Sequence, residues 1–142
     1  MSPCSAVVRL VVFLVCFLAI LGCGGGGDTP PLGRVSGKIL LNGQPLNEGE
    51  IRFQPKSGGR DSFAKISDDG TYKLIYSMDE FGAKVDTHRV VILTDRMGGG
   101  NERVPAQYNH ATELEREVKS GSNLLNFELE GPPPKKSAKG NK

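Results

Sequence analysis

Neighbouring carboxylates are the first residues of this sequence whose types could do chemistry. Asp68 and Asp69 stand together before Gly70, and two carboxylates could contribute to a calcium site. Calcium takes about six to eight oxygen ligands, however, and no third acidic residue stands close in the sequence. Aspartate and glycine also favour tight turns, where glycine supplies a positive φ angle. We therefore expect a turn at residues 68–70 and no metal site.

The histidines and serines lack the spacing of a reactive centre. His88 and His110 are the only histidines, without the pattern of zinc ligands, and we expect both at the surface, His88 on a strand and His110 in a loop. No Gly-x-Ser-x-Gly sequence occurs, and the serines at positions 57, 62 and 67 stand in turn-like settings. A nucleophilic triad is therefore not predicted.

Glu48 and Glu50 are a further pair, with the types required for general acid and base work. They occupy alternate positions beside an expected strand, so they share one face. A solvated strand face explains this spacing more simply than a catalytic pair does.

Cys23 has the most informative surroundings of any reactive side chain. It follows an unbroken apolar run at residues 10–21 and precedes glycines at residues 24–27. A helix that spans a bilayer needs about 20 apolar residues, so this run is short for a permanent span. Arg9 and the amino terminus place positive charge before the run, which is the layout of a secretory signal peptide.

The end of this segment, Ile20-Leu21-Gly22-Cys23, resembles the lipobox of bacterial lipoproteins. The resemblance implies that residues 1–22 are a cleaved signal peptide, that Cys23 carries lipid, and that residues 23–33 are a flexible tether. Two or three acyl chains anchor a protein stably, so membrane lipid is one expected partner. Gly24, where an aspartate would indicate retention in the inner membrane, slightly favours the outer membrane of a cell envelope, with the domain in the periplasm or at the surface. A free Cys23 after a plain secretory signal, and an uncleaved anchor, are the alternatives.

Charge is distributed unevenly along the chain. The formal net charge is +2, but four lysines lie within residues 135–142, and residues 28–130 contain 13 basic and 16 acidic residues. The expected domain is slightly acidic and shows no sign of nucleic-acid binding. Because Cys4 and Cys16 lie in the signal segment, no disulfide is expected in the mature chain.

Alternating apolar residues predict the elements that position these groups. We expect seven strands, at residues 35–41, 50–54, 62–66, 71–76, 89–94, 114–118 and 125–129. The segment 89–94 is apolar on both faces, which is typical of a central strand. A long loop follows at residues 95–112, with room for a short strand at Val104, and residues 131–142 form a disordered tail. This pattern predicts an all-β fold, a seven-stranded antiparallel β-sandwich.

Three segments follow one another in an informative order: residues 35–46 (VSGKILLNGQPL), 49–55 (GEIRFQP) and 68–74 (DDGTYKL). Together they resemble carboxypeptidase regulatory-like domains, and residues 104–109 and 123–129 resemble the later part of small envelope lipoproteins that carry this domain. The resemblance covers residues 34–130. It implies a transthyretin-like (prealbumin-like) sandwich with an immunoglobulin-like Greek key, without catalytic residues or cofactor. Hydroxyisourate hydrolases, an enzyme branch of this fold, end in Tyr-Arg-Gly-Ser, whereas the last strand here reads Phe127-Glu-Leu-Glu130.

The function expected from these observations is a non-enzymatic lipoprotein that presents an interaction or structural module to an envelope protein or cell-wall partner. The alternative is a module that binds carbohydrate or another small ligand. The chain has no tryptophan for a glycan platform. Tyr72 and Tyr76 share the parity of Leu74 and are expected in the core, while Tyr108 is expected to bond a backbone carbonyl and fix the long loop. The lysine tail either contacts anionic lipid or wall polymer, or only keeps the chain soluble.

Overall fold

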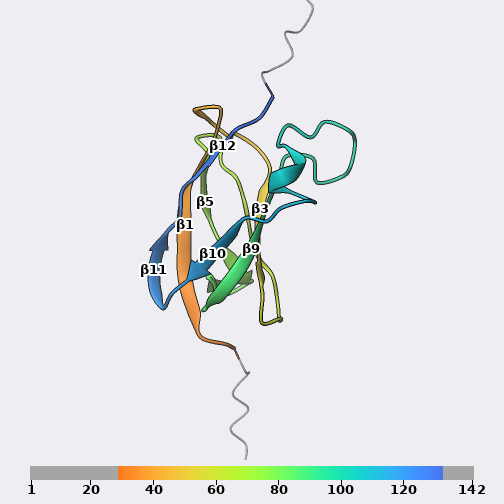
Figure 1. The fold of residues 1–142 in the computed structure, drawn as a ribbon. Coiled ribbons are helices and arrows are strands. Elements are labelled where there is room, and N and C mark those ends of the chain that lie inside the picture. The colour runs from red at the N-terminus through yellow and green to blue at the C-terminus, as the bar shows by residue number, and fades with distance from the viewer. Residues whose placement is uncertain (1–28, 133–142) are drawn as a thin grey trace, which may run out of the picture.

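The structure, a computed structural model, describes residues 29–132. Cys23, the signal segment and the lysines of the tail therefore lie outside the described residues. Within them the chain forms an all-β sandwich of two sheets, which confirms the predicted fold class (Figure 1). No helix in this part of the chain is long and apolar enough to cross a membrane.

Residues 29–132 contain twelve strands and one short 3₁₀ helix, so the strands are shorter and more numerous than the seven expected. β1 begins at Leu32, two residues before the domain start expected from the sequence. The elements are β1 Leu32–Leu41, β2 Gln44–Pro45, β3 Glu50–Pro55, β4 Ser62–Lys65, β5 Thr71–Lys73, β6 Ile75–Ser77, β7 Glu80–Phe81, β8 Ala83–Lys84, β9 Asp86–Leu93, η1 Ala106–Tyr108, β10 Glu115–Val118, β11 Gly121–Leu124 and β12 Phe127–Leu129.

The first sheet is organised around β1. On one side β1 pairs with β8, β5 and β2 in antiparallel register, and on the other it pairs with β11 and β12 in parallel register. The parallel pairs correct the expectation of a wholly antiparallel sandwich. They arise because β10 lies in the other sheet, so the chain crosses over after Val118 and runs back beside β1 in the same direction.

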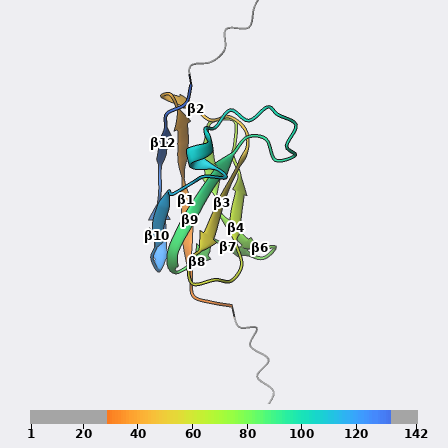
Figure 2. The same ribbon diagram turned by 45° about the vertical axis from the view of Figure 1, so that its right-hand side comes forward.

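The second sheet is antiparallel, with the strand order β10-β9-β3-β4-β6-β7. This sheet faces β1 across the core (Figure 2). β9 lies between β10 and β3, as expected for the segment that is apolar on both faces. Inward residues of both sheets are fully buried, including Ile39, Phe53 and Ile92. The ring of Phe53 packs edge-on against Phe127, with 6.4 Å between centroids, and so joins the sheets.

The chain crosses from the first sheet to the second at Leu74 and returns to the first sheet at Gly82. The single strand expected at residues 71–76 is divided there: β5 pairs with β1, whereas β6 pairs with β4 of the other sheet. The chain returns at Gly82, whose amide donates to the Leu74 carbonyl at 2.8 Å. Gly82 has a φ of 118°, and a Cβ there would lie 2.2 Å from the Gly33 carbonyl oxygen, so only glycine fits this return. Tyr76, expected in the core, is only half-buried because the crossing changes the strand's orientation.

The turn signals read from the sequence are confirmed. Asn42 and Gly43 have φ angles of 52° and 79°, which fit the two-residue turn between β1 and β2. The long loop at residues 95–112 is also present, but Val104 is in no strand, and the loop contains η1 instead.

Candidate functional site

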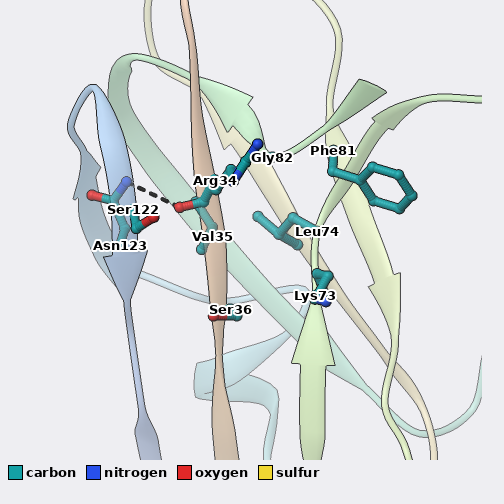
Figure 3. A pocket seen from close by; sticks show the side chains of 9 residues that line it. All are labelled: Arg34, Val35, Ser36, Lys73, Leu74, Phe81, Gly82, Ser122 and Asn123. Carbon is teal, nitrogen blue, oxygen red and sulfur yellow. Dashed lines mark hydrogen bonds between the residues drawn. The ribbon is translucent and has the colours of Figure 1, made fainter. Parts of the chain in front are cut away.

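The most informative cavity opens beside the two sheet crossings and has a volume of about 350 Å³. Its walls come from β1, β5, β11 and the segment around β7. Figure 3 shows β11 on one side of β1, and β5 with the β7 segment on the other. The lining residues are Arg34, Val35, Ser36, Lys73, Leu74, Phe81, Gly82, Ser122 and Asn123.

Strand register brings the polar part of this pocket together. Ser36 of β1 lies directly opposite Lys73 of β5, and Arg34 lies opposite Ser122 of β11. Directly paired residues project from the same face of a sheet. Arg34, Ser36, Lys73 and Ser122 therefore share the outer face of the β1 sheet, where all are at least partly exposed.

Asn123 fixes this geometry and does not remain free for a ligand. Its Nδ2 donates to the Arg34 and Lys119 carbonyls at 3.1 and 2.7 Å, and its Oδ1 accepts from the Lys119 amide at 2.9 Å. These bonds tie the turn before β11 to β1 (Figure 3).

The apolar part of the pocket comes from the crossing segment. Leu74 is fully buried, while Phe81 keeps 57% of its surface exposed beyond it. Phe81 sits on β7, at the edge of the second sheet, and is followed at once by the return through Gly82. Strand pairing links Phe81 through Ile75 to the exposed Phe63, so the Phe81 ring lies at the rim of the pocket, on the outer face of the second sheet and directed away from β1 (Figure 3).

The pocket has an unbalanced charge. Its lining contains two cations and no acidic side chain. Arg34 and Lys73 take part in none of the ion pairs formed within residues 29–132. The arrangement attracts an anion and offers hydroxyl groups and an aromatic face around it.

The expectation for His88 was wrong. His88 is fully buried, and its Nε2 lies 2.8 Å from the Lys84 carbonyl oxygen. β9 begins at Asp86 instead of Arg89, so His88 lies inside the strand on the same face as Val90 and Ile92. The prediction for His110 is confirmed, since it is exposed in the long loop.

The turn-like setting expected for Ser62 was also wrong. It is the first residue of β4, is fully buried, and faces inward with Ala64 and Ile66. Its Oγ has no hydrogen-bond partner in the described part of the chain. A core position without a base or an oxyanion donor beside it does not make a nucleophile.

Ser57 has the neighbours that most resemble a reactive centre. Its Oγ accepts from Lys84 Nζ at 2.6 Å and donates to Asp86 Oδ2 at 2.5 Å. The hydrogen bonds from the Ser57 hydroxyl and amide hold the pKa of Asp86 below its ordinary value, which makes Asp86 a weaker base. These contacts close the β3–β4 turn onto β8 and β9.

Glu50 is not on a solvated face, which corrects the expectation. Its side chain is 5% exposed and pairs with Arg52 at 2.6 Å and Arg96 at 3.0 Å. Arg96 comes from the long loop and covers the start of β3. Glu48 is exposed as expected and pairs with Arg103 at 3.0 Å.

Asp69 has the turn role expected of it. Its Oδ1 accepts from the hydroxyl and the amide of Thr71 at 2.6 and 3.0 Å, and these bonds lower the pKa of Asp69. No cluster of three or more potential metal ligands occurs among residues 29–132.

Tyr72 lies in the core as expected, and its hydroxyl donates to the Leu125 carbonyl at 2.6 Å. Burial raises the pKa of this phenol. Tyr108 does fix the long loop, but its Oη accepts from the Glu130 amide at 3.2 Å instead of donating to a carbonyl.

No motif in the sequence marks Arg34, Lys73 or Phe81 as site residues. The alternation in β1 does indicate that Arg34 points away from the core, which was an available signal. The position of Phe81 had no comparable signal, because the crossings at Leu74 and Gly82 interrupt the strand pattern on both sides of it.

Comparison with known proteins gives a distant structural likeness. No protein-family model matches the chain, and no curated protein matches it. A DUF3823 family protein from Parabacteroides merdae ATCC 43184, solved by crystallography, is similar over 74% of this chain with 16% identity and a TM-score of 0.42. The matched region is 48% of that chain, so this protein spans about half its length.

Proposed function

We propose that this protein is a non-enzymatic binding module held at a membrane of a cell envelope by lipid on Cys23. In this proposal the β-sandwich is a carboxypeptidase regulatory-like domain that presents its outer surface to a ligand or partner. The pocket beside β1 is the observation that carries the binding role, because its two cations have no ion-pair partner in the described chain.

The state of the other polar candidates supports a role without catalysis. Glu50 is held by two arginines, Asp69 serves a turn, and Ser57 bridges two segments. A catalytic group needs a proton or electron pair that is available to substrate. Each of these groups already uses its hydrogen bonds to stabilise the fold.

The sequence around Cys23 supports the anchoring role. Eight residues separate Cys23 from Leu32, where β1 begins at one end of the sandwich (Figure 1). An extended segment of this length reaches no more than about 30 Å. Lipid on Cys23 would therefore keep that end of the domain close to the membrane surface.

The experiment that tests anchoring replaces Cys23 with serine and follows the full chain through membrane fractionation in the native cells. We expect Cys23→Ser to release or mislocalise the protein, because the lipid can no longer attach. Cys16→Ser, in the signal segment, is the matched control and should fractionate as wild type. Retention of Cys23→Ser in the membrane until detergent is added would show that the apolar segment itself is the anchor.

Proximity cross-linking in the same cells tests the binding role. Capture of one envelope protein or wall polymer by the wild type, lost with Cys23→Ser, would support an anchored interaction module. If nothing specific is captured while the purified protein binds a small ligand, the module is a ligand-binding one, which is the alternative that the pocket favours.

A further inference from the structure

The outer face of the β1 sheet gathers cations on neighbouring strands. Arg34 and Lys73 line the pocket, and Lys38 follows on the same face of β1. None of the three joins an ion pair within residues 29–132. Alternate residues of a strand lie about 7 Å apart, and diagonal neighbours on paired strands about 7–8 Å. Lys73, opposite Ser36, therefore has one cation on each diagonal.

Hydroxyl groups stand between these cations. Ser36 lies between Arg34 and Lys38 along β1, and Ser122 lies beside Arg34 on β11. Both residues are at least partly exposed, so their hydroxyls can donate to or accept from a ligand. Uncharged partners next to cations suit a ligand that carries alcohols as well as an anionic group.

Phe81 adds an apolar surface at the rim of this pocket. It remains 57% exposed, with the buried Leu74 between it and β1 (Figure 3). One face of a pyranose ring is lined mainly by C–H groups and packs well on an aromatic ring. The volume of about 350 Å³ is at the lower end of ligand pockets, which is enough for one or two sugar units.

We infer that this pocket binds an acidic saccharide, with its carboxylate or phosphate between Arg34 and Lys73, its hydroxyls on Ser36 and Ser122, and its ring against Phe81. The inference rests on the proposed binding function and gives it a ligand class. A nucleic acid fits less well, because single strands bind through several stacked aromatic residues and a broad basic surface. The described domain offers one exposed aromatic here and an excess of acidic residues overall.

The test measures binding to the purified full chain in a polyoxyethylene detergent, which contains no sugar. The probes are trigalacturonate and glucose 6-phosphate, with maltotriose as the neutral saccharide, inorganic phosphate as the bare anion, and phosphatidylglycerol vesicles as a lipid source. We expect at least one acidic saccharide to bind more tightly than maltotriose and phosphate, and the binding to weaken with salt.

Matched variants locate the site. Replacing both Arg34 and Lys73 with glutamine should weaken binding by about tenfold or more, since each removes a charge-assisted hydrogen bond. Phe81→Ala should weaken it several-fold. Lys65→Gln and Phe63→Ala, which change an exposed lysine and a half-exposed phenylalanine outside the pocket, should bind as wild type. Thermal unfolding of each variant confirms that it is folded.

Four results would overturn the inference: no binding of either acidic saccharide, equal binding of maltotriose, binding of phosphate alone with the same affinity, or wild-type binding by the double variant. Binding to vesicles without binding to saccharide would assign the face to lipid headgroups and also overturn it. These failures are distinct from failure of the proposed function, which the Cys23→Ser fractionation and the cross-linking decide without any saccharide probe.

Discussion

The outer face of β1 and the corner where β3 meets the long loop use the same kinds of charged residue in opposite ways. In the corner, the buried Glu50 is held between Arg52 and Arg96. On the β1 face, Arg34 and Lys73 stand beside a cavity with no acid in its lining. The comparison separates charge that stabilises the fold from charge that remains available to a ligand.

The long loop extends this structural use of charge. Asp95 accepts hydrogen bonds from the amides of Met97, Gly100 and Asn101, and Glu102 accepts from Thr94, Asp95 and Val104. The loop is therefore fixed by two carboxylates, and Arg96 within it reaches back to Glu50. The long loop therefore belongs to the architecture of the corner.

Among the variants that test this comparison, we expect removal of the Glu50 side chain to have the largest effect on stability. Glu50→Ala leaves Arg52 and Arg96 without their shared acceptor and should lower the free energy of unfolding by about 1–3 kcal/mol. The exposure of both guanidinium groups keeps the loss below that of a fully buried pair. Urea denaturation monitored by circular dichroism measures the change.

Glu48→Ala is the control, because Glu48 pairs with Arg103 at the surface. Its cost should not exceed about 1 kcal/mol. Equal losses for the two variants would contradict the structural role assigned to Glu50.

Acidification gives a second, smaller effect, confined to the corner. Amide hydrogen bonds, above all that from Gly99, lower the pKa of Asp95. Partial burial raises the pKa of Glu102, but hydrogen bonds from Asp95, Thr94 and Val104 outweigh it and leave a lowered value. Because both pKa values are lower in the folded than in the unfolded chain, their stabilisation is complete above about pH 4–5 and is lost as the pH falls through the folded values.

The amide resonances of Thr94, Gly100 and Val104 should therefore shift on acidification, with midpoints below the ordinary carboxyl range, as followed by two-dimensional NMR. Asp95→Asn should abolish the transition at Gly100 and leave the one at Val104. Midpoints at or above the ordinary values would show that these carboxylates do not hold the loop.

Neutralising the β1 face should have the smallest effect on stability. Substitution of both Arg34 and Lys73 by glutamine removes no ion pair of the described chain, so the free energy of unfolding should change by no more than about 0.5 kcal/mol. The same urea titration measures it beside Glu50→Ala. A loss comparable to that of Glu50→Ala would mean that these cations stabilise the fold, and the contrast between the two regions would disappear.

Much of the sandwich could be predicted because its strands repeat a local pattern. Val35 and Ile39 of β1, and Ile51 and Phe53 of β3, all face the core as their alternation indicated. Prediction failed where a strand changed sheet or began earlier than its apolar residues suggested. The crossing at Leu74 left Tyr76 half-buried, and the early start of β9 placed His88 in the core.

Little of the candidate site could be predicted, for a related reason. Arg34 and Lys73 become neighbours only because β5 pairs with β1 in a register that sets Ser36 against Lys73. Phe81 joins them only because the chain crosses back at Gly82. No sequence separation or composition signal indicates that register or that crossing.

The sequence alone determined the all-β class, the inward rows and the turns at Asn42-Gly43 and Gly70, because alternation and turn chemistry depend on residues within a few positions of one another. The sequence around Cys23 also predicts that this residue carries lipid. The tertiary structure decided which charges are paired, since partners such as Lys56 and Glu115 are 59 positions apart in the chain. Whether a cation stabilises the fold or faces a pocket depends on which acid the folded chain brings within a few ångströms of it, and strand pairing across the whole domain sets that distance.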